Sequence, residues 1–168
     1  KAFKEKDPNG NGKADEIPFI GDINGWNSQP QKFFMNAFIY YNDSYNYLLV
    51  DNGKIDTGAN KDEWKQGLEY LNKLYSDGLI SPLTFTQDRA QLQQVIENPD
   101  AQIIGSVASG SMSMYQTDSK RKEDMTHLPP LTGPDGVCWS TKRYQGPKNA
   151  VTLRRMRRIP RSRSVFWI

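Results

Sequence analysis

This 168-residue sequence is nearly devoid of the two side chains that most often carry nucleophilic and metal chemistry: it has one histidine, His127, and one cysteine, Cys138. A single histidine excludes a histidine-rich zinc site. Because His127 stands close to Pro129 and Pro130, we interpret it as a strand-end residue rather than a catalytic base. A single cysteine excludes an internal disulfide framework, and we expect Cys138 to be a small buried apolar residue. The sequence therefore predicts a protein that is not an enzyme.

Acidic residues are missing from the end of the chain. Residues 1–135 contain all 19 acids and carry a net charge of −6, whereas residues 136–168 contain nine of the 22 lysines and arginines and carry +9. An arginine-rich end normally indicates a tail for nucleic acid or anionic lipid, but this one lacks the interleaved stacking aromatics of such tails. Our hypothesis is that residues 151–168 are translated out of frame, since a two-nucleotide shift over Arg158 to Ile168 can encode a capped helix start. We assign this tail no function and expect no nucleic-acid partner.

Oxygen-bearing side chains are concentrated near the N-terminus, in the run Asp7-Pro8-Asn9-Gly10-Asn11-Gly12-Lys13-Ala14-Asp15-Glu16. Calcium takes six to eight oxygen ligands from a tightly turning loop of this kind, in which glycines allow the sharp bends. The first six positions match an EF-hand, but the twelfth is Pro18 where an EF-hand has a bidentate glutamate. Asp15 and Glu16 would therefore have to close the site. A solvated turn uses the same residue types, but five oxygen donors at this spacing favour calcium.

The run D-P-N-G-N-G-K-x-D-E-I-P-F resembles the calcium loop of a family of bacterial extracellular solute-binding proteins. These are lipid-anchored or periplasmic receptors for carbohydrates and oligosaccharides that serve ABC importers, and they include the alginate-binding proteins. Four further segments are similar to the same family: Gly25-Trp26 with the aromatic residues after it, the hairpin 49–55, the block 60–80 and the Pro/Gly-rich run 129–136. The resemblance implies a structural calcium ion held by Asp7, Asn9, Asn11, the carbonyl of Lys13, Asp15 and Glu16.

The resemblance also implies a fold and a role. Members of the family are several times longer and have an α/β, periplasmic-binding-protein-like fold of two lobes. We therefore expect the chain to be an internal piece of such a protein, with residues 1–136 in the lobe or lobes. Residues 137–150 continue from this part, and we assign them to no lobe. The implied function is capture of a carbohydrate between the lobes and its delivery to an ABC permease.

The expected location follows from the same resemblance. The sequence has no signal peptide and no run long enough to span a membrane. Association with the extracellular face of the cell membrane would therefore need a lipid anchor that lies outside this piece. The other location that the family implies is the periplasm.

The alternative hypothesis is a calcium-stabilised module of a secreted polysaccharide-degrading enzyme, or a dockerin-like adaptor. A dockerin needs the loop duplicated and an acidic residue at position twelve, and the sequence has neither. A glycosidase needs two carboxylates that face a sugar, whereas Asp15 and Glu16 are adjacent and better used on calcium. The receptor interpretation is therefore favoured.

Local patterns predict a mixture of helices and strands. We expect strands at 17–20 and 101–107, a hairpin of 47–50 and 54–57, and helices at 31–41, 61–77 and 87–97. Asn60 with Glu63 predicts an N-cap for the long helix, and Gly78 predicts its left-handed C-terminal end. The small residues at 108–113 follow a strand, which is where α/β proteins usually hold ligands.

Aromatic side chains are the candidates for sugar stacking, because pyranose rings present apolar C–H patches between their hydroxyls. Trp26 lies in a polar loop without a periodic partner and is the first candidate, followed by Tyr115 and Trp139. Burial in the core is the competing explanation for all three. Trp64 lies on the regular face of the long helix, and we expect it in the core.

Overall fold

The computed structural model describes residues 1–99, 102–123 and 125–139. Its helices are α1 (Ala2–Glu5), α2 (Gln31–Phe34), α3 (Asp62–Ser76) and α4 (Arg89–Ile96), and its strands are β1 (Leu48–Asp51) and β2 (Lys54–Thr57). Short 3-10 helices occupy Met35–Ala37, Asp43–Tyr45, Gly58–Asn60, Pro82–Phe85, Met112–Met114 and Lys120–Lys122. The arginine-rich tail at 151–168 and most of the continuation at 137–150 lie outside the described residues.

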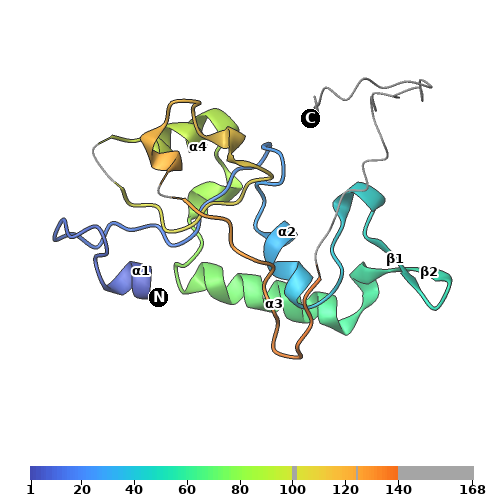
Figure 1. Ribbon diagram of the computed structural model, residues 1–168. Coiled ribbons are helices and arrows are strands. Elements are labelled where there is room, and N and C mark those ends of the chain that lie inside the picture. The colour runs from blue at the N-terminus through green and yellow to red at the C-terminus, as the bar shows by residue number, and fades with distance from the viewer. Residues whose placement is uncertain (100–101, 124, 140–168) are drawn as a thin grey trace, which may run out of the picture.

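The longest helix, α3, runs along one side of the molecule with α2 against it, and α4 lies on the opposite side (Figure 1). The hairpin β1–β2 extends beyond the N-terminal end of α3, because only one turn of 3-10 helix separates β2 from α3. Antiparallel pairing runs from Leu48 opposite Thr57 to Asp51 opposite Lys54. Asn52 and Gly53 both have positive φ, 48° and 77°, as a two-residue hairpin turn requires, so the predicted hairpin is confirmed.

Both ends of α3 were predicted, and one prediction was wrong. At the C-terminal end, Gly78 has φ +67°, its N–H donates to Tyr75 O, and the Leu79 N–H donates to Leu74 O. These bonds satisfy carbonyls that the helix leaves free, as predicted. At the N-terminal end, Asn60 lies in the preceding 3-10 turn, and α3 begins after Lys61 without a side-chain cap.

The helix predicted at 31–41 is shorter than expected, since α2 ends at Phe34 and passes into the 3-10 turn Met35–Ala37. Asn36 accounts for the early end. Its side-chain amide donates to Lys32 O at 3.0 Å, and its Oδ1 accepts the Tyr41 N–H at 3.1 Å. An asparagine that bonds the nearby backbone in this way competes with helical hydrogen bonds.

The segments predicted as strands at 17–20 and 101–107 lie side by side and run parallel. Ile17 pairs with Ile104 and Ile20 pairs with Val107, through isolated bridges rather than a continuous ladder. The bridged residues are three positions apart on each segment, whereas a continuous ladder repeats every two residues, and between the bridges the Pro18 carbonyl accepts the Ser106 hydroxyl at 2.6 Å. Residue 101 lies outside the described residues.

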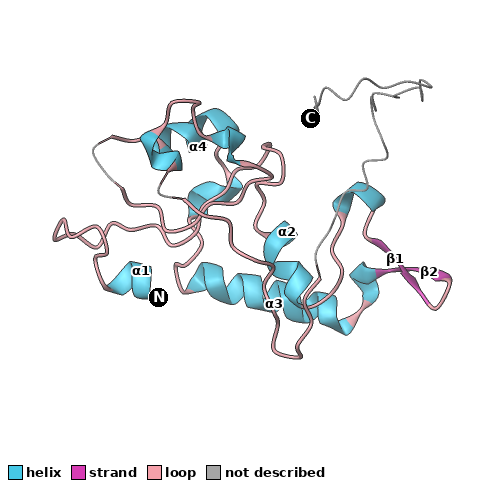
Figure 2. Ribbon diagram, viewed as in Figure 1, coloured by secondary structure: helices cyan, strands magenta, loops and turns pink. Residues whose placement is uncertain are grey.

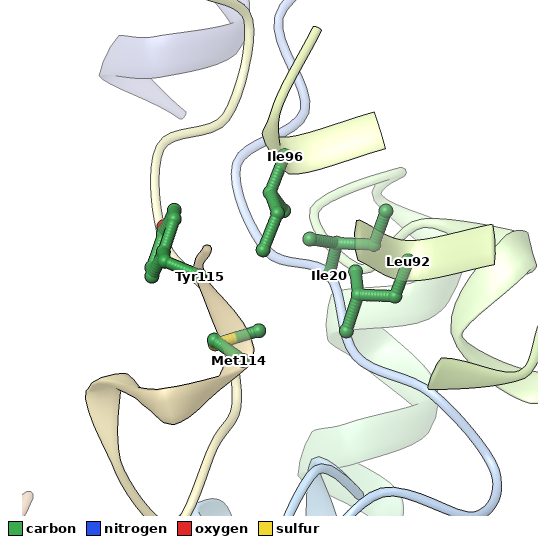
Figure 3. Close-up of a cluster of buried hydrophobic side chains, with 5 residues drawn as sticks. All are labelled: Ile20, Leu92, Ile96, Met114 and Tyr115. Atoms are coloured by element: carbon green, nitrogen blue, oxygen red, sulfur yellow. The ribbon is translucent and has the colours of Figure 1, made fainter. Parts of the chain in front are cut away.

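Two clusters of buried side chains hold the fold together. The first contains Ile20, Leu92, Ile96, Met114 and Tyr115, contributed by the segment after the N-terminal loop, by α4 and by the chain that follows it (Figure 3). The second contains Met35, Ile39 and Tyr41, with Trp64 stacked on Tyr41 at 5.3 Å between ring centroids. Trp64 therefore packs against the core, as predicted.

Loops and turns make up most of the part of the chain that the structure describes, helices exceed strands, and the hairpin is its only sheet of named strands (Figure 2). The α/β alternation expected from the sequence is thus present only as the parallel bridges beside α4. Among the described helices, none combines the length and the apolar character that crossing a membrane requires.

Candidate functional site

The N-terminal loop closes on the carboxylate of Asp7. The Asn11 N–H donates to Asp7 Oδ1 at 3.1 Å and the Gly12 N–H donates to Asp7 Oδ2 at 2.8 Å. Gly10 and Gly12 have φ of +70° and +76°, which a residue without a Cβ adopts readily. The glycines of the motif therefore allow the chain to turn around the first carboxylate.

The two asparagines of the loop continue this pattern. Asn9 Oδ1 accepts the Asn11 N–H at 2.9 Å, and Asn11 Oδ1 accepts the Lys13 N–H at 2.7 Å. The Asn11 amide nitrogen lies 3.2 Å from both carboxylate oxygens of Asp15. Hydrogen bonds thus join the predicted ligands from Asp7 to Asp15 into one chain of contacts.

Glu16, the last residue of the loop, differs from the others because its side chain is buried. It is 7% exposed, and neither of its carboxylate oxygens has a hydrogen-bond partner. A buried carboxylate without a partner is costly, by several kcal/mol even after relaxation. A cation next to Glu16 would offset the cost of burying this carboxylate.

The loop offers the oxygen ligands that calcium prefers, namely carboxylates, amide oxygens and a backbone carbonyl. Within the described residues, no group of three or more Asp, Glu, His or Cys side chains is placed to hold a metal, so Asp7, Asp15 and Glu16 do not meet as a trio. A group of this kind contains only Asp, Glu, His and Cys side chains, whereas half of the six predicted ligands are amide or carbonyl oxygens. Together with the unpartnered Glu16 carboxylate, the donor set fits a calcium ion.

A second candidate region lies where the loop 21–28 meets the loop 108–113. Each loop follows one of the two paired parallel segments, so both stand at the carboxyl ends of neighbouring strands, where open α/β sheets bind ligands. The Gly110 N–H donates to Trp26 O at 2.9 Å and joins the loops. Trp26 is 54% exposed although its ring lies against Gly110.

Three serines stand close to Gly110 in the sequence, namely Ser109, Ser111 and Ser113. Ser109 Oγ donates to Ser111 O at 2.7 Å, and the hydroxyls of Ser111 and Ser113 lie 2.7 Å apart. Sequence reasoning noted that small residues follow a strand here, but it missed the role of Gly110. The signal that could have revealed it is the predicted pair of strands, since parallel pairing of the two brings their following loops together.

The other two aromatic candidates lie elsewhere. Tyr115 is buried in the first core cluster, so its ring face is not open to a ligand (Figure 3). Burial, aided by the negative charge of Glu97, raises the pKa of its hydroxyl to about 12. Trp139 is 52% exposed, meets Tyr40 edge-on at 6.0 Å and donates its backbone N–H to Asn36 O. The neighbouring Cys138 is exposed, so the prediction that it is buried was wrong.

Two curated proteins are similar in sequence, whereas no family model matches. The fructooligosaccharide ABC transporter substrate-binding protein FusA of Streptococcus pneumoniae is 43% identical over 89 residues, which cover 52% of this chain and 16% of FusA. The lipoprotein LipO of Bacillus subtilis is 31% identical over 160 residues, which cover 90% of this chain and 32% of LipO. The chain thus spans at most 32% of the length of either curated relative.

Solved structures are similar in fold over 82% of this chain. FusA of S. pneumoniae in complex with kestose has a TM-score of 0.66 at 35% identity, and the match covers 26% of that chain. An EF-hand mutant of FusA in complex with fructo-nystose has a TM-score of 0.65 at 33% identity. An extracellular solute-binding protein from Bifidobacterium longum subsp. infantis has a TM-score of 0.62 at 28% identity, covering 30% of that chain. FusA is a transporter substrate-binding protein, which agrees with the prediction of no enzyme activity and gives the enzyme-module alternative no support.

Proposed function

Because this chain belongs to the bacterial extracellular solute-binding proteins of ABC transporters, of which it corresponds to a part, we propose that it helps to capture an oligosaccharide and carries a structural calcium loop. The family resemblance of the sequence motifs is thereby confirmed. The two-lobe architecture, the sugar and the calcium ligands of this chain are parts of the proposal.

The observation that carries sugar binding is the exposed indole of Trp26 at the carboxyl ends of the two parallel segments. An aromatic ring that rests on a glycine keeps its other face free, and such a face packs against the C–H patch of a sugar ring. The hydroxyls of Ser109, Ser111 and Ser113 stand on the loop that carries Gly110 and supply hydrogen-bonding groups beside it. The complexes of FusA with kestose and fructo-nystose support a fructo-oligosaccharide as the ligand class.

Calcium would be held by the side chains of Asp7, Asn9, Asn11, Asp15 and Glu16 and by the carbonyl of Lys13. A bound cation supplies the positive charge that the buried Glu16 carboxylate requires and ties together the side chains of the loop. Asp7 and the asparagines orient the loop backbone through the hydrogen bonds described above. Since the loop ends where the segment 17–20 begins, we assign the ion a structural role and no contact with the sugar.

The relatives support a location and a partner for the whole protein. LipO is a lipoprotein, which supports anchoring of the whole protein by a lipid at the extracellular face of the membrane, and FusA serves an ABC transporter. We accordingly propose that lobes closing around the sugar present it to the permease subunits of such a transporter.

The test is calorimetric titration of the full-length protein that contains this chain with kestose and longer fructo-oligosaccharides. We expect saturable binding that Trp26→Ala weakens about tenfold or more, the cost typical of a central aromatic contact. Tyr75→Ala is the matched control, because Tyr75 is an exposed aromatic on α3 that contacts Phe85 instead. A folded protein that binds no oligosaccharide contradicts the proposed capture, and full affinity in the Trp26 variant contradicts the stacking role.

A further inference from the structure

The loop that carries Trp26 is organised around a buried carboxylate. Asp22 is only 2% exposed. Its Oδ1 accepts hydrogen bonds from the Asn24 N–H at 3.0 Å, from the Gly25 N–H, and from the Ser28 hydroxyl at 2.7 Å. These donors come from both sides of Trp26 in the sequence, so a single oxygen holds the two arms of the loop together.

The loop has little room for another arrangement. A Cβ on Gly25 would overlap both carboxylate oxygens of Asp22 and the Ser28 hydroxyl, and a Cβ on Gly21 would overlap the Ser28 carbonyl. The glycines therefore let the backbone wrap tightly around the Asp22 side chain. The tightness of this wrapping fixes the direction in which the tip of the loop points.

Neighbouring elements fix the base of the same loop. The buried Gln87 side chain donates to Gly21 O at 2.6 Å, and the Gly21 N–H donates to Thr84 Oγ1 at 3.2 Å. Asn24 Oδ1 accepts the N–H of Arg89 at the start of α4, at 3.0 Å. With its base held and its arms joined by Asp22, the loop can place the ring of Trp26 on Gly110.

Packing alone does not account for a buried acceptor side chain at this position, because burying a polar or charged group costs free energy that hydrogen bonds must offset. No ion pair with Asp22 occurs among the described residues. The three hydrogen bonds to its Oδ1 all act on the segment that presents the exposed indole.

We infer that Asp22 is a positioning residue for oligosaccharide binding, which holds the loop 21–28 so that the Trp26 ring lies on Gly110 with one face open to the sugar. This inference rests on the proposed function, since Asp22 touches no ligand itself. It predicts that the effect of losing Asp22 on affinity is transmitted through Trp26 alone.

The test combines a double-mutant cycle with a signal from the ring. Kestose affinity is measured for the full-length protein and for Asp22→Ala, Trp26→Ala and the double variant. Asp22→Ala is expected to weaken binding about tenfold, and the double variant to bind no more weakly than Trp26→Ala, because residues that act as a unit are not additive. Asp22→Asn keeps an acceptor oxygen and is expected to restore affinity to within about threefold of the natural protein.

Fluorine NMR of protein labelled with 5-fluorotryptophan reports on the loop without any sugar. The Trp26 resonance, assigned with Trp26→Phe, is expected to shift or broaden in Asp22→Ala and to be retained in Asp22→Asn. If Asp22→Ala does not fold, Ser28→Ala removes one of the same hydrogen bonds and is expected to change the resonance in the same way. An unchanged resonance, or additive losses in the cycle, overturns the inference. A changed resonance with sugar affinity unaffected by Trp26→Ala overturns the stacking role in the proposed function instead.

Discussion

Gly110 and Trp26, 84 positions apart in the sequence, are joined by a hydrogen bond of 2.9 Å from the glycine N–H to the tryptophan carbonyl. The indole ring of Trp26 also occupies the space where a Cβ on residue 110 would stand. The contact links the loops that follow two parallel segments, and it holds an exposed aromatic ring in a fixed position against Gly110. The candidate sugar site depends on this pair.

Replacing Gly110 by alanine should move the ring. The added Cβ would lie 2.5–2.9 Å from three atoms of the indole, so either the ring or the loop must shift. We expect oligosaccharide affinity to fall about tenfold, as for the loss of a central aromatic contact. In calorimetry, the double variant Gly110→Ala, Trp26→Ala should bind like Trp26→Ala alone. A further loss in the double variant would mean that Gly110 acts by another route.

Calcium should decide the sign of the effect of Glu16→Gln on stability. Without calcium, the variant should be at least as stable as the natural chain, because it removes a buried carboxylate that has no partner. With calcium at about 100 times its dissociation constant, the natural chain should gain roughly 2.7 kcal/mol and the variant much less.

Thermal unfolding with calcium and with a chelator measures both quantities. The control is Asp62→Asn, which removes an exposed carboxylate in the first turn of α3. This variant should respond to calcium as the natural chain does. Equal calcium responses of the natural chain and Glu16→Gln would remove Glu16 from the ligand set.

Two residues one turn apart on the apolar face of α3 should differ in their contribution to stability. Trp64 packs between Tyr41 and Tyr47, whereas Leu68 is exposed. Trp64→Ala should therefore lower the free energy of unfolding by about 3–5 kcal/mol, as for other large-to-small core changes. Leu68→Ala should lower it by about 0.5 kcal/mol or less. Urea unfolding of the two variants checks the difference, and similar losses would contradict the structure.

Any side chain at Gly78, the left-handed residue that ends α3, should lower the free energy of unfolding. At Gly78, where φ is +67°, alanine should lower the free energy of unfolding by about 1–2 kcal/mol, since a Cβ strains this conformation. Gly58→Ala is the matched control, because the nearest atoms to its Cβ would be 3.5 Å away and its φ is not positive. Its free energy of unfolding should be unchanged or slightly higher.

Alkaline pH should destabilise the fold through Tyr115. Burial and the charge of Glu97 raise its pKa from 10.0 to about 12. Between these values the unfolded chain has already released the proton that the folded chain keeps, so the free energy of unfolding falls as pH rises through this window. Tyr115→Phe should make the fall less steep in urea unfolding from pH 9 upward. Part of the fall should remain, because burial also raises the pKa of Tyr41. Tyr45 is exposed, so Tyr45→Phe is the control and should leave the pH dependence unchanged.

The sequence by itself determined the features that depend on neighbours along the chain. Asn52-Gly53 formed the expected hairpin turn and Gly78 ended α3, because positive φ at these positions is set by the residues themselves. The loop from Asp7 to Asp15 likewise follows from short-range bonds of carboxylates and amides to the backbone. Trp64 could be assigned to the core because helical spacing places it on an apolar face.

Tertiary structure decided which of the remaining side chains are buried and which loops meet. The early end of α2 is an exception, because it is a local effect that the helical pattern did not reveal: the Asn36 side chain bonds Lys32 and Tyr41, only four and five positions away. Tyr115 entered the core because Ile20, Leu92 and Ile96, which are distant in the sequence, pack around it. No local pattern reports such covering, since it depends on the parallel pairing of 17–20 with 104–107. The same pairing brings Trp26 against Gly110. The sequence could therefore identify the aromatic ring as a candidate, but only the fold shows the glycine on which the ring packs.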